Sequence, residues 1–179
     1  MPKVIENLRE KLLEEARRQV GERGFGRTTI RSVAQACGVA TGTVYNYFPS
    51  KEMLVATFMA QDWRDLTESV ARRDPADRKA YIHAVYDAIR RFSETYKTLF
   101  ADGDALRAFY AVFTTRHAQL REGLAALLLP VCPAGDAEER AFLAAFTAEA
   151  LLTWTVAQIP FDQLYAVLNK TLEDQKKGR

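Results

Sequence analysis

Small hydroxyl, amide and phenol side chains follow one another in the run TGTVYNY, which covers residues 41–47. Groups of this kind make hydrogen bonds to base edges and to backbone phosphates. A short exposed helix with a purely structural role more often carries Glu and Lys. The residues expected on the outer face are Thr41, Gly42, Thr43, Tyr45 and Asn46. With Lys51 following as a cation for a phosphate, the segment predicts a surface that reads nucleic acid.

Two helices and a tight turn are expected to position this surface. Thr28 and Thr29 can cap a first helix, which has apolar residues at helical spacing. Gly38 can adopt a positive φ in the turn, so that the second helix leaves at a steep angle. The second helix, residues 41–47, is expected to bury Val44 and Tyr47. At about 1.5 Å per residue it is about 10 Å long, which fits a major groove about 12 Å wide.

Joined to the run GVATGTVYNYFPSKE, these residues resemble the TetR family of transcriptional regulators, and the resemblance covers residues 8–58. It implies a helix-turn-helix domain that binds DNA as a homodimer. Base contacts are implied for Thr41, Gly42 and Thr43. Phosphate contacts are implied mainly for Tyr45, Asn46, Tyr47 and Lys51. Two further contacts, from the first helix of the motif, are implied for Thr29 and Arg31.

Composition sets outer bounds on the class of protein. The chain has 179 residues, of which 48% are hydrophobic and 27% charged, and its net charge is only +2. We expect a cytoplasmic protein, because no apolar run approaches a bilayer span and the N-terminus is too charged for a signal peptide. Cys37 and Cys132 have neither disulfide nor zinc spacing. Without a metal site, a phosphate loop or a nucleophile motif, we expect no cofactor and no enzymatic activity.

The remaining pattern predicts an all-α fold of about nine helices, with a head at residues 1–50 and a body at 51–179. Beyond the motif, helices are expected at residues 4–23, 51–73, 75–100, 104–129, 136–158 and 161–175. Asp74 is expected to cap the third of these, with Pro75 in its first turn. Gly103 is expected to break the chain after it, and a bend near Thr114 is expected to divide residues 104–129 into two helices. The next start signals are Ser50 for residue 51 and a capping box of Asp136 with Glu139.

Aromatic residues concentrate in the body. Ordinary core packing explains aromatics at helical spacing, but the family resemblance implies a ligand site among helices of the body. The candidate ligand-binding residues are Tyr86, Phe92, Tyr96, Phe109, Tyr110, Phe113, His117 and Trp154. Such a lining favours a small apolar or aromatic ligand. His117 is the candidate polar contact, with a satisfied core histidine as the alternative.

The last two helices carry apolar residues on more than one face, which indicates that they pair in a homodimer. The sequence therefore predicts a repressor that binds a near-palindromic DNA operator and is released by an inducer. One alternative is a DNA-binding protein of the same fold controlled by a protein partner. Another is a helical enzyme or carrier with a vestigial head.

Overall fold

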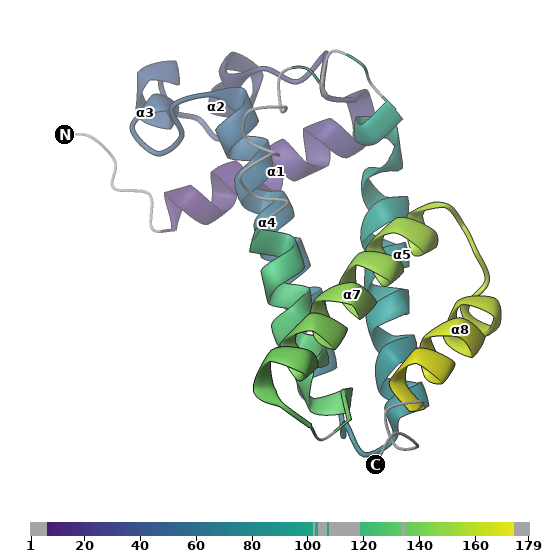
Figure 1. Ribbon diagram of the computed structural model, residues 1–179. Coiled ribbons are helices and arrows are strands. Elements are labelled where there is room, and N and C mark those ends of the chain that lie inside the picture. Colours follow the sequence, from purple (N-terminus) through teal and green to yellow (C-terminus); the bar gives the residue numbers. More distant parts are fainter. Residues whose placement is uncertain (1–6, 102, 104–106, 108–118, 134, 174–179) are drawn as a thin grey trace. The chain divides into compact units, whose positions relative to one another are not determined.

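The computed structural model describes residues 7–101, 103, 107, 119–133 and 135–173, and within these ranges it contains helices and no strand (Figure 1). The elements are α1 (Leu8–Arg23), α2 (Ile30–Ala36), α3 (Thr41–Tyr45), α4 (Lys51–Ala71), α5 (Arg78–Ala101), the 3-10 turn η1 (Leu129–Val131), α7 (Ala137–Val156) and α8 (Phe161–Glu173). Residues 119–128 are also helical. The predicted all-α fold class is confirmed.

The described residues fall into two compact units. The first contains residues 7–62 together with 96–101, 103 and 107, and the second contains 63–95, 119–133 and 135–173. The boundary therefore passes through two helices, α4 and α5. We call the first unit the head and the second the body.

Apolar residues from α1, α2 and α3 form the core of the head. Leu12, Ala16, Val33 and Val44 are fully or almost fully buried, as their helical spacing predicts. Phe58 of α4 lies in the same unit and is also buried. A core built from one face of each short helix holds the motif together, because a helix of five to seven residues is not stable by itself.

The body has its own core, which Val70 of α4, α5, residues 124–132, α7 and α8 supply. Leu151 of α7 and Leu168 of α8 are almost completely buried there. Two buried tyrosines in the body part of α5 use their hydroxyls: Tyr81 donates to the carbonyl of Leu127 at 3.1 Å, and Tyr86 donates to that of Ile159 at 3.0 Å. These bonds satisfy polar groups that burial would otherwise leave unpaired.

The N-terminus of α5 differs from the prediction. Asp74 does not cap it but accepts the backbone N–H of Ala76 at 2.9 Å, closing a turn. Asp77 then accepts the N–H of Ala80 at 3.0 Å, and the helix begins at Arg78. Either aspartate could have capped the helix by residue type, but Asp74 closes the preceding turn and Asp77 is the cap.

Other boundaries shift by less. The capping box of Asp136 with Glu139 predicted for α7 is wrong, because Asp136 accepts the N–H of Glu138, at 2.7 Å. α4 ends at Ala71 rather than 73, because the N–H of Arg73 closes a tighter turn on the carbonyl of Val70. The break expected at Gly103 is also wrong, since this residue is helical. The bend near Thr114 and the ends of the predicted helices at residues 4–6 and 174–175 lie outside the described residues.

Candidate nucleic-acid interface

The turn between α2 and α3 depends on Gly38, whose backbone has a conformation that glycine adopts more readily than other residues. Gly38 has φ 68°, in the left-handed region that favours glycine. Its N–H donates to the carbonyl of Gln35 at 3.2 Å, and the N–H of Val39 donates to that of Ala34 at 3.0 Å. This pair of bonds is the Schellman arrangement that ends a helix. The positive φ predicted for Gly38 is confirmed, and it sets the direction in which α3 leaves.

α3 is shorter than predicted and presents more of its surface. It ends at Tyr45 instead of residue 47, and the N–H of Tyr47 bonds the carbonyl of Val44 in a tight turn. Val44 is completely buried, whereas Tyr45 is 52% and Tyr47 46% exposed. The prediction that Tyr47 buries this helix is therefore wrong. Phe48, the next residue, is buried in its place.

The hydrogen-bonding side chains predicted for DNA gather on and around α3. Gly42 and Asn46 are exposed and Thr41 and Thr43 are half-buried. Val44 anchors the helix in the head core, so that the remaining side chains turn outward. A helix of this size with hydroxyl, amide and phenol groups outside can enter a major groove and reach base edges.

Two candidate contacts come from the start of α2. Thr29 is its N-cap and is exposed, and Arg31 in the first turn is exposed as well. Thr29 and Ser32 form a reciprocal capping box, with bonds of 3.0 and 3.1 Å. Thr28, the other candidate cap, is buried and donates to the carbonyl of Gly24 at 2.9 Å. Of the two threonines, only Thr29 faces outward.

Lys51 has an internal role that the sequence did not reveal. Its ammonium group donates to the carbonyl of Phe25 at 2.9 Å and lies 3.8 Å from the centre of the Phe25 ring. Ser50 caps the same helix, accepting the N–H of Met53 at 3.2 Å, as predicted. Lys51 therefore connects the start of α4 to the loop between α1 and α2, beside the helix-turn-helix motif.

A second polar contact in the head joins α1, α4 and α5. Arg17 donates two hydrogen bonds to the Asp62 carboxylate, at 2.6 and 3.3 Å. The Tyr96 hydroxyl donates to the same carboxylate, and burial, assisted by this bond, raises the pKa of Tyr96. The Arg17 guanidinium also lies 5.4 Å from the centre of the Phe58 ring. These partners are 34 and 45 positions apart, so no local pattern could indicate them.

The predicted ligand-binding residues that the structure describes belong to both units. Tyr86 is buried in the body core, and Phe92 makes an edge-to-face contact with Trp63 at 5.2 Å. Tyr96 belongs to the head, and Trp154 is half exposed on α7. The other members, Phe109, Tyr110, Phe113 and His117, lie outside the described residues. The ligand site stays a prediction.

The cysteines show no feature of a reactive site. Burial raises the pKa of the Cys37 thiol, whose Sγ lies 3.7 Å from the carbonyl oxygen of Lys11, and burial likewise raises the pKa of Cys132. A raised pKa keeps a thiol protonated and slow to react at neutral pH. In the parts of the chain that the structure describes, acidic, histidine and cysteine side chains nowhere gather as a metal site would require. Nor is any described helix both long and apolar enough to span a bilayer.

Comparison with known proteins agrees with this geometry. Residues 12–57 match the family model described as bacterial regulatory proteins, tetR family. The HTH-type transcriptional regulator BetI of Burkholderia cenocepacia (strain HI2424) is 40% identical over 81 residues, which cover 44% of this chain and 42% of that protein. The HTH-type transcriptional repressor KstR2 of Mycobacterium tuberculosis (strain CDC 1551 / Oshkosh) is 33% identical over 93 residues, covering 48% and 46%. The chain thus matches less than half the length of these curated relatives.

Solved structures resemble the chain over nearly its whole length. Thermus thermophilus FadR, a TetR-family repressor crystallised with lauroyl-CoA, has a TM-score of 0.56 at 23% identity, and 92% of each chain is covered. Salmonella enterica GusR has a TM-score of 0.62 at 21% identity, covering 96% of this chain and 99% of that one. At these identities the likeness establishes the fold alone.

A capped helix, a left-handed glycine turn and a short helix with an exposed polar face define a helix-turn-helix protein of the DNA-binding class. The matching family model covers this motif and the core that carries it. The helix-turn-helix part of the chain, residues 12–57, matches that of the tetR family of bacterial regulatory proteins.

Proposed function

We propose that this chain is a homodimeric repressor that binds a near-palindromic operator and is released by a small apolar or aromatic ligand. The observation that carries the proposal is the outer surface of α3, where uncharged hydrogen-bonding side chains are exposed while Val44 fixes the helix in the core. In the proposed complex Thr41, Gly42 and Thr43 contact bases. Tyr45, Asn46, Tyr47 and Lys51 contact phosphates, as Thr29 and Arg31 do beside them.

Homodimer formation is supported by apolar side chains left in solvent on the last two helices. Phe142 is 68% exposed and stacks on Phe146, one helical turn further along α7. Trp154 continues the exposed apolar surface of α7, and Val167 of α8 is exposed as well. Apolar surface of this extent on a helix pair is typical of a protein interface, and a second copy of the chain is the proposed occupant.

The dimer can be tested with Phe142→Asp, which puts a charge into the proposed interface. We expect this variant to elute as a monomer in size-exclusion chromatography with light scattering, where the unchanged protein elutes as a dimer. Arg91→Asp is the matched control, because it alters an exposed charged position of α5, outside the two helices of the proposed interface. A Phe142→Asp protein that remains dimeric would contradict the proposed interface.

The proposal of an apolar ligand starts from the aromatic residues of the body. The similar Thermus thermophilus protein binds lauroyl-CoA, a molecule with a long apolar chain. We propose that this chain also binds an apolar ligand, within a ligand-binding and dimerisation domain at residues 51–179. Residues 1–50 would then bind DNA. A ligand that binds one conformation of the dimer more tightly than the other shifts the equilibrium between them. The resulting change in DNA affinity is limited by the ligand's difference in affinity for the two conformations.

The experiment that tests the function is selection from random duplex DNA, followed by titration of the best site with and without ligands. The ligand panel contains lauroyl-CoA, free fatty acids and planar aromatic compounds. A selected palindrome that ligand releases is the expected result. A palindrome that no ligand affects would favour control by a protein partner. A chain that selects no sequence would overturn the DNA-binding proposal.

Thermal stability gives an independent reading of ligand binding. A ligand that binds the folded chain raises its stability by about RT ln(1 + [L]/Kd), which is about 2.7 kcal/mol at a hundredfold excess over Kd. We expect a compound that releases DNA also to raise the melting temperature. Release without such a shift would point to competition for DNA itself.

A further inference from the structure

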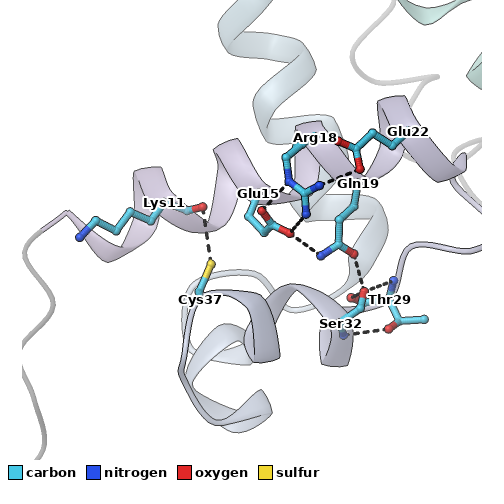
Figure 2. A network of polar contacts seen from close by, with 8 residues as sticks. All are labelled: Lys11, Glu15, Arg18, Gln19, Glu22, Thr29, Ser32 and Cys37. Carbon is cyan, nitrogen blue, oxygen red and sulfur yellow. Dashed lines mark hydrogen bonds and ion pairs between the residues drawn. The ribbon is translucent and has the colours of Figure 1, made fainter.

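An uncharged polar side chain lies inside the head where the neighbouring positions are apolar. Gln19 of α1 is only 1% exposed, between the buried residues Ala16 and Val20. A buried amide has to find partners for both its oxygen and its nitrogen, and an apolar residue there would need none. The amide of Gln19 bonds Glu15 of α1 and Ser32 in the first turn of α2 (Figure 2).

The orientation of the Gln19 amide is fixed from one side. Its Nε2 donates to the Glu15 carboxylate at 2.6 Å. Hydrogen bonds from Arg18, at 2.6 and 2.9 Å, are the main reason that the pKa of Glu15 is lowered. Arg18 is itself paired with Glu22 at 2.6 Å. An ionised carboxylate only accepts, so the amide nitrogen must face Glu15 and the amide oxygen must face the other way.

On the other side lies the hydroxyl group of Ser32, 2.6 Å from Gln19 Oε1. Since Oε1 only accepts, Ser32 must donate its one proton to it. The same hydroxyl is also 2.8 Å from the carbonyl oxygen of Thr29, which is an alternative acceptor. The distance to Gln19 Oε1 is the shorter of the two, so we assign the proton to the bond with Gln19.

Once its proton points at Gln19, the Ser32 oxygen is oriented to accept the N–H of Thr29, at 3.1 Å. The N–H of Ser32 donates in return to Thr29 Oγ1 at 3.0 Å. Thr29 Oγ1 is thus used as an acceptor, and its hydroxyl proton can be donated outward. Figure 2 shows this chain of bonds passing from Arg18 through Glu15, Gln19 and Ser32 to Thr29.

We propose that Gln19 is a positioning residue for DNA binding: from inside the head it holds Ser32, and through Ser32 it orients the Thr29 hydroxyl toward a DNA phosphate. The inference rests on the proposed function. Without Gln19, the Ser32 hydroxyl turns to the Thr29 carbonyl, and the capping box loses its fixed geometry. Thr29 then contacts phosphate less well, although no DNA-facing atom has been removed.

The test compares Gln19→Met with Val20→Ala, using the operator selected by the unchanged protein. Val20 is the adjacent buried residue, and its truncation lowers stability without touching the polar chain. We expect Gln19→Met to weaken operator binding about fivefold, the size of one capping interaction. Val20→Ala should leave binding unchanged at a temperature where both variants are folded. Equal effects of the two variants, or none from Gln19→Met, would overturn the proposal.

A double-mutant cycle locates the effect at Thr29. Thr29→Ala should weaken binding in the unchanged protein and should have no further effect in the Gln19→Met protein. It should leave the slope of log affinity against log salt unchanged, because a neutral hydroxyl group releases no counterion from a phosphate. Independent, additive effects of the two substitutions would overturn the proposal.

A second variant covers the case in which Gln19→Met does not fold. Gln19→Met with Ser32→Ala makes both partners apolar, which is far less costly than leaving one of them buried and unpaired. We expect this protein to fold and still to bind the operator about fivefold more weakly, whereas full affinity would overturn the proposal. Absence of binding by the unchanged protein would overturn the proposed function, and the role of Gln19 with it. The two failures are therefore distinguishable.

Discussion

Replacing Lys51 by Met separates the internal role of this lysine from its predicted contact with DNA. The Lys51 ammonium donates to the Phe25 carbonyl at 2.9 Å and lies 3.8 Å from the Phe25 ring. A hydrogen bond from a charged donor contributes about 1.5–3 kcal/mol, and a cation–π contact at a partly exposed site about 0.5–1 kcal/mol. Both depend on one half-buried ammonium group and do not add in full. We therefore expect Lys51→Met to lose about 2 kcal/mol of head stability.

The assay is urea unfolding in the absence of DNA, followed by circular dichroism, with amide hydrogen exchange of α1 and α2 to assign the loss to the head. Lys11→Met is the matched control, because Lys11 is an exposed lysine of the same unit. We expect the control to change stability by less than about 0.5 kcal/mol. If Lys51→Met unfolds at the same urea concentration as Lys11→Met, the inferred internal role is wrong.

DNA binding by the same variant gives a second, independent result. If the Lys51 ammonium also contacts a phosphate in the complex, the slope of log affinity against log salt falls by about 0.9 per protomer. A lysine that acts only within the head would change affinity without changing this slope. The two measurements thus report on two different partners of one side chain.

Three further changes test other contacts in the head. Tyr96→Phe removes a hydrogen bond to a carboxylate on α4, and chemical denaturation should show a loss of about 1.5–3 kcal/mol; a loss below 0.5 kcal/mol would contradict the contact. Since the bond from Arg18 lowers the pKa of Glu15 below its usual 4.5, its stabilisation is present above that pH and is lost as the pH falls through the folded pKa. Glu15→Gln should therefore cost about 0.3–1 kcal/mol at pH 7 and progressively less as the pH is lowered through the folded pKa, as unfolding measurements over a pH series would show; a cost that does not change with pH would refute the linkage. Residue 38 has φ 68° and no atom lies near an added Cβ, so Gly38→Ala should cost about 1–2 kcal/mol through backbone strain alone. Gly42→Ala in α3 should be neutral or stabilising, and equal melting temperatures of the two variants would contradict the difference.

Local signals in the sequence were enough to predict the motif. Gly38, Thr29 and Ser50 act through backbone groups within four residues, so their roles follow from residue type and spacing. The same local reasoning failed where two residues could serve one purpose. Asp74 and Asp77 competed to cap α5, and Tyr47 and Phe48 competed for one place in the core.

The polar contacts between helices could not be predicted in this way. Gln19 and Ser32 are 13 positions apart, Phe25 and Lys51 are 26 apart, and Arg17 and Asp62 are 45 apart. Their pairing depends on how the helices cross, which periodicity does not specify. Gln19 alone gave a signal, as an uncharged polar residue within a buried apolar stripe.

The contact of Tyr96 with Asp62 has a consequence for synthesis on the ribosome. These two residues of the head are 34 positions apart, and the intervening segment contributes to the body. At about 5–20 residues per second, Tyr96 is made about 2–7 s after Asp62. A nascent chain that has only the helix-turn-helix segment therefore lacks part of the unit that stabilises it. For the same reason, a chimera that transfers residues 1–57 to another body leaves Arg17 without its carboxylate, and a transferable head must bring both segments.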